Sequence, residues 1–169
     1  MRPFPIRQID AAGFAPYGWL AEAGGATGRP INDGTSLRVD GVGELQLTAE
    51  GGAPCLALFR ARPRDPRGPW QVLERHRLGT QTFVPMGGAR YVVLVALGDV
   101  HPDMDTLAAF SVAGHQAVTL RAGTWHHGLI APQGGDFVVI ERRGAEVDNE
   151  LATLAEAVTL SVEFDALRH

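Results

Sequence analysis

The stretch LERHRLGTQTF, residues 73–83, carries polar side chains at spacings that suit chemistry inside a β-sheet. Glu74 and His76 are two residues apart in a predicted strand, so both side chains point to one face. After a turn at residues 78–79, Gln81 opens a second strand pattern. We expect this carboxylate, imidazole and amide to converge inside a barrel and act on one ligand. The alternative is a surface histidine with Glu74 as its ion partner.

A second candidate lies in TWHHGL, residues 124–129, where His126 and His127 are adjacent. Neighbours in a strand point to opposite faces, so only one of the two can face a given pocket. This stretch alone leaves the choice open. Trp125, just before them, is interpreted either as a packing residue or as a pocket wall.

The composition excludes several classes of chemistry. All fifteen basic side chains are arginine, so neither a lysine Schiff base nor a lysine general base is available. Arginine instead suits paired hydrogen bonds to a carboxylate. The net charge of −4 gives no reason to expect nucleic acid or a membrane as a partner. Cys55 is the single cysteine, so no internal disulfide is possible, and we expect a cytoplasmic protein.

Short runs with strand character, separated by glycine and proline turns, must position these residues. They predict an all-β protein, an antiparallel sandwich or barrel, in one domain spanning residues 1–169. Helix is scarce: one short helix is expected after Asp10 as its cap, and another over residues 149–157. Residues 27–43 are interpreted as a loop over a pocket. The predicted strands are residues 55–61, 70–76, 81–86, 90–97, 107–112, 117–120 and 136–142.

The pattern Gly-x-x-His at residues 123–126, together with the polar cluster at 74–81, resembles the cupin superfamily. Cupins place two histidines, an acid and a third histidine in a small barrel, where they often bind a metal. The matching positions here are Glu74, His76, Gln81 and His126. Glutamate and histidine are competent ligands of a divalent metal, whereas glutamine is a weak one. This match selects His126 as the inward residue and leaves His127 to face outward or to support a neighbour.

Longer motifs give a closer resemblance. LERHRLGTQTFVPM, YVVLVALGD, TWHHGLIAP and DFVVIERRG, in this order, resemble the ureidoglycolate lyase family of allantoin breakdown, and FAPYGWL, PINDGTSLR and LFRARP fit it as well. The resemblance runs from about Phe14 to about Gly144. It implies a cupin-like β-barrel (a double-stranded β-helix, or jelly roll), a homodimer, and cleavage of ureidoglycolate to glyoxylate and urea. Nickel has been associated with some members, so a divalent metal is a candidate cofactor.

Cleavage of ureidoglycolate, a carbinolamine, needs a base for the hydroxyl proton and an acid for the leaving urea nitrogen. It also needs a group that holds the carboxylate. Our hypothesis takes His76 or His126 as the base, because histidine titrates near neutrality. Glu74 orients the imidazole, or acts as the acid if an apolar wall of Trp125 and Phe83 raises its pKa.

The remaining roles concern substrate binding. Gln81 is expected to donate a hydrogen bond to the substrate, and Asn32 to bind its urea end. Arg38 or Arg75 would hold the carboxylate; Arg38 is preferred because Arg75 should point away from Glu74. The candidate substrate-binding residues are thus Arg38, Asn32, Trp125, His127 and Phe83.

Two other functions compete with the lyase. One is a metal-dependent cupin that hydrolyses or oxidises another small hydroxy acid. The other is a cupin that binds a small molecule without catalysis. A lyase releases urea intact, an amidohydrolase releases ammonia, and a binding module releases neither. The complete polar cluster counts against the binding module.

Overall fold

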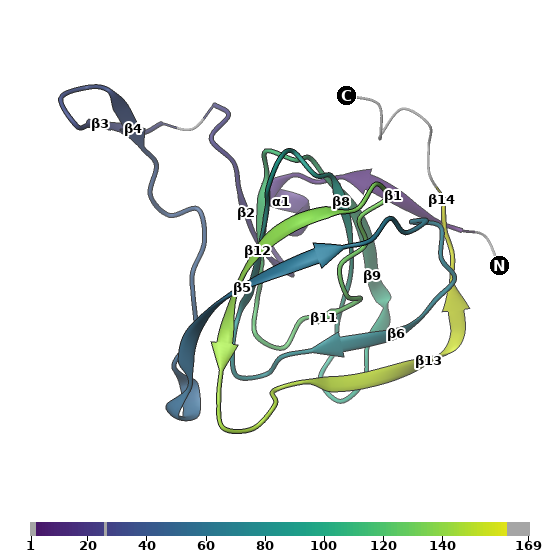
Figure 1. The fold of residues 1–169 in the computed structure, drawn as a ribbon. Helices are drawn as coiled ribbons and strands as arrows, with labels where there is room; N and C mark the ends of the chain where they lie inside the picture. The colour runs from purple at the N-terminus through teal and green to yellow at the C-terminus, as the bar shows by residue number, and fades with distance from the viewer. Residues whose placement is uncertain (1–2, 26, 162–169) are drawn as a thin grey trace.

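The computed structural model describes residues 3–25 and 27–161, and its regular structure is almost entirely β (Figure 1). Two sheets curve around a shared interior. The larger has the order β13 (Glu150–Val158), β6 (Trp70–Arg75), β11 (Trp125–His126), β8 (Tyr91–Leu97), β9 (Asp103–Val112), β1 (Phe4–Gln8), β14 (Leu160–Ser161). The smaller has the order β2 (Gly18–Ala21), β10 (Ala117–Leu120), β7 (Gln81–Pro85), β12 (Gly135–Arg143), β5 (Ala53–Ala61). The all-β barrel predicted from the sequence is confirmed.

Large apolar side chains from both sheets fill the interior. Tyr91 and Phe137 meet edge to face with ring centroids 5.2 Å apart, and Phe110 packs in the same cluster. β8 is buried on both faces, which explains its continuous apolar sequence YVVLVAL. Its alternate residues, such as Leu94, join a second cluster with Trp125. The site-bearing strands β6 and β11 are therefore held by apolar packing behind them.

The seven predicted strands correspond to β5 to β10 and β12; β10 has the predicted ends, and the others differ at one or both ends. The largest shift is in β9, which begins at Asp103 and not at Leu107. The helix expected after Asp10 is α1 (Ala11–Phe14), and the Asp10 carboxylate accepts a hydrogen bond from the Gly13 N–H at 2.8 Å. A single 3₁₀ turn, η1 (Ala49–Gly51), precedes β5.

The helix predicted over residues 149–157 is wrong, because this segment forms strand β13. It pairs antiparallel with β6, and Leu154 and Val158 enter the apolar cluster that contains Trp70. Pairing with a neighbouring strand has overridden a helix-compatible local sequence. The antiparallel prediction is also incomplete, because β1 runs parallel to both β9 and β14. No hairpin turn joins β1 to either neighbour, so nothing local forces an antiparallel direction.

The loop predicted at residues 27–43 is also corrected, because it contains a hairpin of β3 (Arg29–Ile31) and β4 (Ser36–Arg38). The turn uses positive φ angles at residues 32–34, which suits its Asn-Asp-Gly sequence. The hairpin is a separate two-stranded sheet that stands away from the barrel and does not cover it (Figure 1).

Candidate active site

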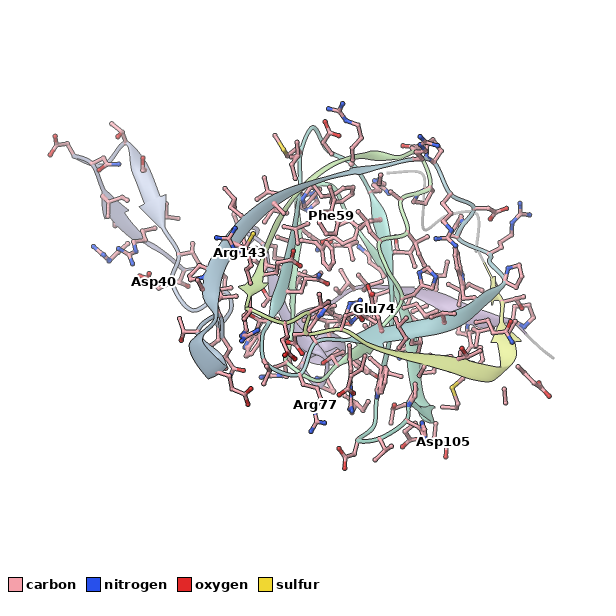
Figure 2. All side chains as sticks on the ribbon, turned by 60° about the horizontal axis from the view of Figure 1, so that its bottom comes forward. Asp40, Phe59, Glu74, Arg77, Asp105 and Arg143 are labelled. Atoms are coloured by element: carbon pink, nitrogen blue, oxygen red, sulfur yellow. The ribbon has the colours of Figure 1, made fainter. Side chains whose placement is uncertain are left out.

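A cleft of about 540 Å³ lies where the two sheets face each other. Its walls come from β5, β6, β7 and β12, and from residues 144–149, which connect β12 to β13. Phe59, Glu74 and Arg143, labelled in Figure 2, all line it. The volume suits a small polar molecule rather than a polymer.

Glu74, His76 and His126 meet in this region, with one ligand-type atom from each lying within 4.8 Å of the others. The backbone register dictates this meeting: His126 on β11 is the direct partner of Glu74 on β6. Glu74 Oε1 lies 3.6 Å from His126 Nε2, and the two imidazole centroids are 5.4 Å apart. A carboxylate and two imidazoles are a donor set that divalent metals prefer.

Both imidazoles are fixed through Nδ1. His76 Nδ1 contacts the backbone oxygen of Asp148, and His126 Nδ1 lies 3.0 Å from that of Thr124. A carbonyl oxygen only accepts, so each Nδ1 carries a hydrogen, and in the neutral form of either ring Nε2 presents a lone pair. Both Nε2 atoms are buried and have no hydrogen-bond partner among the described residues.

Glu74 and Gln81 each form a hydrogen bond with a residue outside the cluster. Asn149 Nδ2 donates to Glu74 Oε2 at 3.0 Å, which leaves Oε1 beside His126. Gln81 Nε2 donates to a carboxylate oxygen of Glu141 at 2.9 Å, which leaves Gln81 Oε1 buried without a partner. One of the two amide N–H bonds is therefore engaged with Glu141, and the donation from Gln81 to a substrate stays a prediction for the other.

Burial is the main electrostatic influence on His126, which is only 2% exposed. It lowers the pKa of this imidazole to about 4, so the side chain is neutral at pH 7. An efficient general base has a pKa near the working pH, and His126 departs from that. Its neutral Nε2 lone pair suits a cation better.

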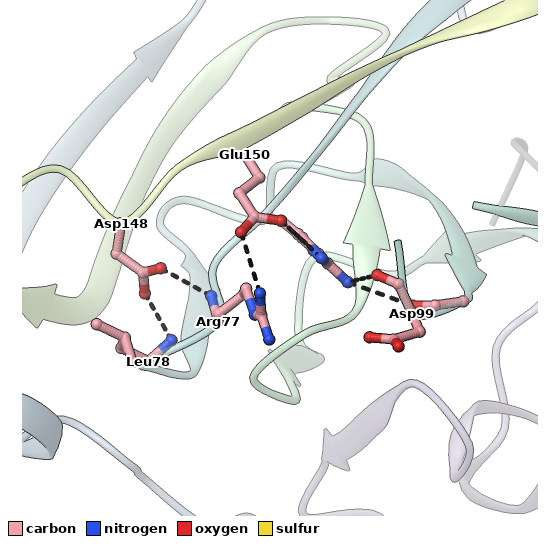
Figure 3. A network of polar contacts seen from close by, with 7 residues as sticks. Arg77, Leu78, Asp99, Asp148 and Glu150 are labelled. Atoms are coloured by element: carbon pink, nitrogen blue, oxygen red, sulfur yellow. Dashed lines mark hydrogen bonds and ion pairs between the residues drawn. The ribbon is translucent and has the colours of Figure 1, made fainter. Parts of the chain in front are cut away.

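The loop after β6 is tied to the connection between β12 and β13 (Figure 3). The two carboxylate oxygens of Asp148 accept the backbone N–H groups of Arg77 and Leu78, each at 2.8 Å. The backbone oxygen of the same residue holds His76. Asp148 therefore sets the position of the His76 ring relative to β6.

The structure brings His126 and not His127 to the cluster. The His127 ring packs against Trp70 with centroids 4.5 Å apart, and its Nδ1 lies 2.7 Å from the Gly128 oxygen. Burial lowers the pKa of His127 as well. These contacts give His127 a packing role.

Two predicted aromatic walls lie elsewhere. Trp125 is 1% exposed in the second apolar cluster, where the Arg75 guanidinium lies 4.4 Å from its ring centroid. Phe83 is buried in the interior, and Phe59, whose centroid is 6.3 Å from that of Phe83, lines the cleft in its place. The wall role of both residues is corrected: Trp125 lies on the opposite face of its strand from His126, and Phe83 shares a face with Gln81 but is covered by the interior apolar cluster.

The predicted arginines are also away from the cleft. Arg38 and Asn32 belong to the projecting hairpin, and Arg38 Nε lies 2.7 Å from Asp40, which Figure 2 shows outside the barrel. Arg75 points away from Glu74, as predicted, and pairs with Glu150. Within one chain neither arginine reaches the cleft.

Sequence reasoning missed Glu141, Arg143 and Asn149. Glu141 and Arg143 share one face of β12 with the buried Val139, so period-two reasoning on DFVVIERRG would find them. Asn149 falls within the predicted helix and in the structure directly precedes strand β13. Among the described residues, the Arg143 side chain makes no hydrogen bond or ion pair, whereas Arg142 donates to backbone oxygens of Ala49 and Glu50.

Fold and site together define a class: a small all-β barrel enzyme with a histidine–carboxylate cluster in an open cleft. A family model described as ureidoglycolate lyase matches residues 1–161. The chain belongs to the ureidoglycolate lyase family, a family of lyases.

Curated relatives agree with this assignment. A ureidoglycolate lyase of Burkholderia mallei (strain NCTC 10229) is 40% identical over 146 residues, which are 85% of each chain. One from Burkholderia cepacia is 34% identical over 94% of this chain and 90% of its own. One from Salmonella paratyphi B is 37% identical over 83% and 88%. The described residues contain no helix with the length and hydrophobicity of a membrane span.

Proposed function

We propose that this protein cleaves ureidoglycolate into glyoxylate and urea, a step of allantoin breakdown. The observation that carries the proposal is the meeting of Glu74, His76 and His126 within 4.8 Å, with Glu74 and His76 lining a cleft sized for a small molecule. Relatives that cover most of this chain bear the name of that activity. The cleavage is an elimination, so the absence of an activated nucleophile among these residues is no obstacle.

The donor set also fits a divalent cation, for which we propose nickel, in keeping with the family resemblance and the two imidazoles. Three buried acceptors have no partner within residues 3–25 and 27–161: His76 Nε2, His126 Nε2 and Gln81 Oε1. Glu74 adds a negative charge. Buried acceptors without partners are costly, and a cation would satisfy them. These four residues would hold it. A bound metal would lower the pKa of a coordinated hydroxyl and polarise its oxygen.

The chain's own residues account for the proton transfer. Glu74 is the charged member of the cluster and is partly exposed to the cleft, with its Oε2 fixed by Asn149. We assign it to accept the hydroxyl proton of the substrate as the carbonyl forms. The carbon–nitrogen bond breaks, and the same carboxyl returns the proton to the urea nitrogen. One group thus performs both transfers, and no proton is gained or lost overall.

Arg143 is assigned to the substrate carboxylate. It lines the cleft, lies on the same face of β12 as Glu141, and has its guanidinium available among the described residues. A guanidinium can hold a carboxylate through two parallel hydrogen bonds. This role replaces the one predicted for Arg38.

We further propose a cytoplasmic homodimer with no nucleic-acid or membrane partner. An apolar edge supports the dimer: β5 ends the smaller sheet, and its Leu56 and Leu58 are 74% and 59% exposed. An exposed apolar edge strand is a surface that proteins normally cover. The net charge of −4 supports a small-molecule substrate over nucleic acid.

The decisive experiment is turnover of ureidoglycolate by metal-stripped protein, before and after nickel, manganese or zinc is added back. Glyoxylate, urea and ammonia are quantified together. Equal glyoxylate and urea, restored by metal, are expected. Ammonia in place of urea would indicate a hydrolase acting on the ureido group. No glyoxylate from folded, metal-loaded protein would overturn the proposal.

A further inference from the structure

We propose that Glu141 is a positioning residue that turns the carbonyl oxygen of Gln81 toward the metal-binding cluster. The inference rests on the proposed function, since it concerns the cation that Glu74, His76 and His126 would share. It assigns a role to a carboxylate that contacts no other member of the cluster. Glu141 would decide whether Gln81 offers the site an acceptor or a donor.

The strand register places the two side chains together. Gln81 on β7 is the direct antiparallel partner of Glu141 on β12, so both side chains project from the same face. Gln81 Nε2 donates to Glu141 Oε2 at 2.9 Å. Both residues line the cleft with Glu74 and His76.

Donor and acceptor chemistry then fixes the amide. A primary amide can rotate by half a turn with almost no change of shape, so packing alone does not choose its orientation. An ionised carboxylate only accepts, so Glu141 stabilises the orientation with the N–H₂ group toward it. The reverse orientation would place the Gln81 oxygen against the carboxylate oxygen. It would also aim an N–H₂ group at the cation that the other residues attract.

Gln81 is the proposed ligand that most needs this control. The other members have no comparable freedom: each imidazole is held by a backbone oxygen, and a carboxylate presents oxygen either way. Glutamine is also the weakest ligand type of the four. The Glu141 carboxylate also accepts a hydrogen bond from the Gln81 amide nitrogen. Its negative charge polarises the amide and makes the Gln81 carbonyl oxygen a stronger ligand.

Nickel binding to the metal-stripped protein tests the proposal through a readout separate from turnover. Isothermal titration with Ni²⁺ compares wild type with Glu141→Gln, which keeps size but allows either amide orientation. The matched control is Glu146→Gln, which removes the same charge from the same cleft. We expect Glu141→Gln to lose about 10–100-fold in Ni²⁺ affinity, the range typical of outer partners of a metal ligand, and the control to lose less than about threefold.

The double variant Gln81→Glu with Glu141→Gln moves the carboxylate inward and reverses the hydrogen bond. It should recover most of the lost affinity and shift the visible absorption bands of bound Co²⁺, because an amide ligand is replaced by a carboxylate. Equal losses in Glu141→Gln and Glu146→Gln would overturn the inference in favour of general electrostatics. An unchanged affinity in Glu141→Gln would overturn it directly.

The two proposals fail in different ways. If wild type releases glyoxylate and urea but binds neither Ni²⁺ nor Co²⁺, the lyase function stands and the role of Glu141 is wrong. If wild type binds Ni²⁺ and Glu141→Gln weakens it, but no glyoxylate forms, the positioning role stands and the proposed substrate is wrong.

Discussion

Arg75 stacks over Trp125 on the reverse face of the two strands that carry Glu74 and His126. The guanidinium carbon lies 4.4 Å from the indole centroid, and residues 74 and 126 are direct cross-strand partners. Because successive side chains alternate between faces, each polar site residue has a buried packing residue as its neighbour. The positions of Glu74 and His126 therefore depend on the packing of the buried Arg75 guanidinium behind them.

Replacing Arg75 by methionine should lower stability and loosen the site. The guanidinium is nearly buried, donates to the backbone oxygens of Gly98 and Asp99, and pairs with Glu150 at 2.6 Å. Methionine retains apolar volume but leaves both oxygens without this donor, at a cost of about 2–3 kcal/mol. Urea unfolding monitored by tryptophan fluorescence would measure it. Arg77→Met, at an exposed arginine of the same segment, is the control and should stay within about 0.5 kcal/mol. Equal losses in the two variants would contradict the role of Arg75.

The Arg75–Glu150 pair should make stability depend on acid pH. Hydrogen bonding from Arg75 holds the pKa of the Glu150 carboxyl below its ordinary value. A carboxyl with a lowered folded pKa contributes stability above its unfolded pKa, about 4.3, and loses it as the pH falls through the folded value. Denaturant midpoints between pH 6 and pH 3 should therefore fall more steeply for wild type than for Glu150→Gln. Parallel curves for the two proteins would show that this pair is not linked to folding.

The strands that the sequence predicts correctly are those with a clear apolar pattern. Runs such as YVVLVAL and the alternation around Gln81 indicate strands directly, and those strands are present. The segment ELATLAEAV carries a pattern compatible with a helix, and only pairing with β6 makes it a strand. The N-terminal strand β1 likewise depends on partners distant in the sequence. Such nonlocal pairings have no signal in a local window.

The site residues show the same difference between features set by local spacing and features set by contacts distant in the sequence. Spacing within a strand predicts that Glu74 and His76 share a face, the resemblance to cupins selects His126, and the structure brings the three together. Trp125 does not line the cleft because it joins the other buried face of β11, and Phe83 does not because it lies deeper in the interior on the face of Gln81; hydrophobicity alone reveals neither the face nor the depth. Arg38 was favoured for its loop, yet the loop folds into a hairpin directed away from the cleft. The hydrogen bond from Gln81 to Glu141 depends on cross-strand register, which the sequence alone does not fix.

Alanine substitutions of the adjacent histidines His126 and His127 should have different effects on turnover and on stability. His126→Ala removes a buried acceptor of the cluster, so turnover should fall by more than the roughly 10–100-fold typical of outer partners, with loss of stoichiometric Ni²⁺ binding. His127→Ala removes the ring packed on Trp70, so stability should fall by about 1 kcal/mol while turnover stays within about tenfold. Steady-state kinetics, nickel titration and urea unfolding on both variants provide the comparison. A larger loss of turnover in His127→Ala would reverse the assignment.

Arg143 and Arg38 offer alternative anchors for the substrate carboxylate, and one pair of variants distinguishes them. Arg143 lines the cleft without a side-chain partner among the described residues, whereas Arg38 is exposed and engaged with Asp40. Losing a charge-assisted hydrogen bond to a carboxylate costs about 1.5–3 kcal/mol, so Arg143→Gln should reduce kcat/KM by about 10–100-fold, mainly through KM. Arg38→Gln should reduce it by less than about threefold. If Arg38→Gln instead raised KM strongly and Arg143→Gln did not, the hairpin of a second copy would have to complete the cleft. Mixing Arg38→Gln protein with inactive His126→Ala protein would then restore turnover, because a mixed dimer would hold one intact site.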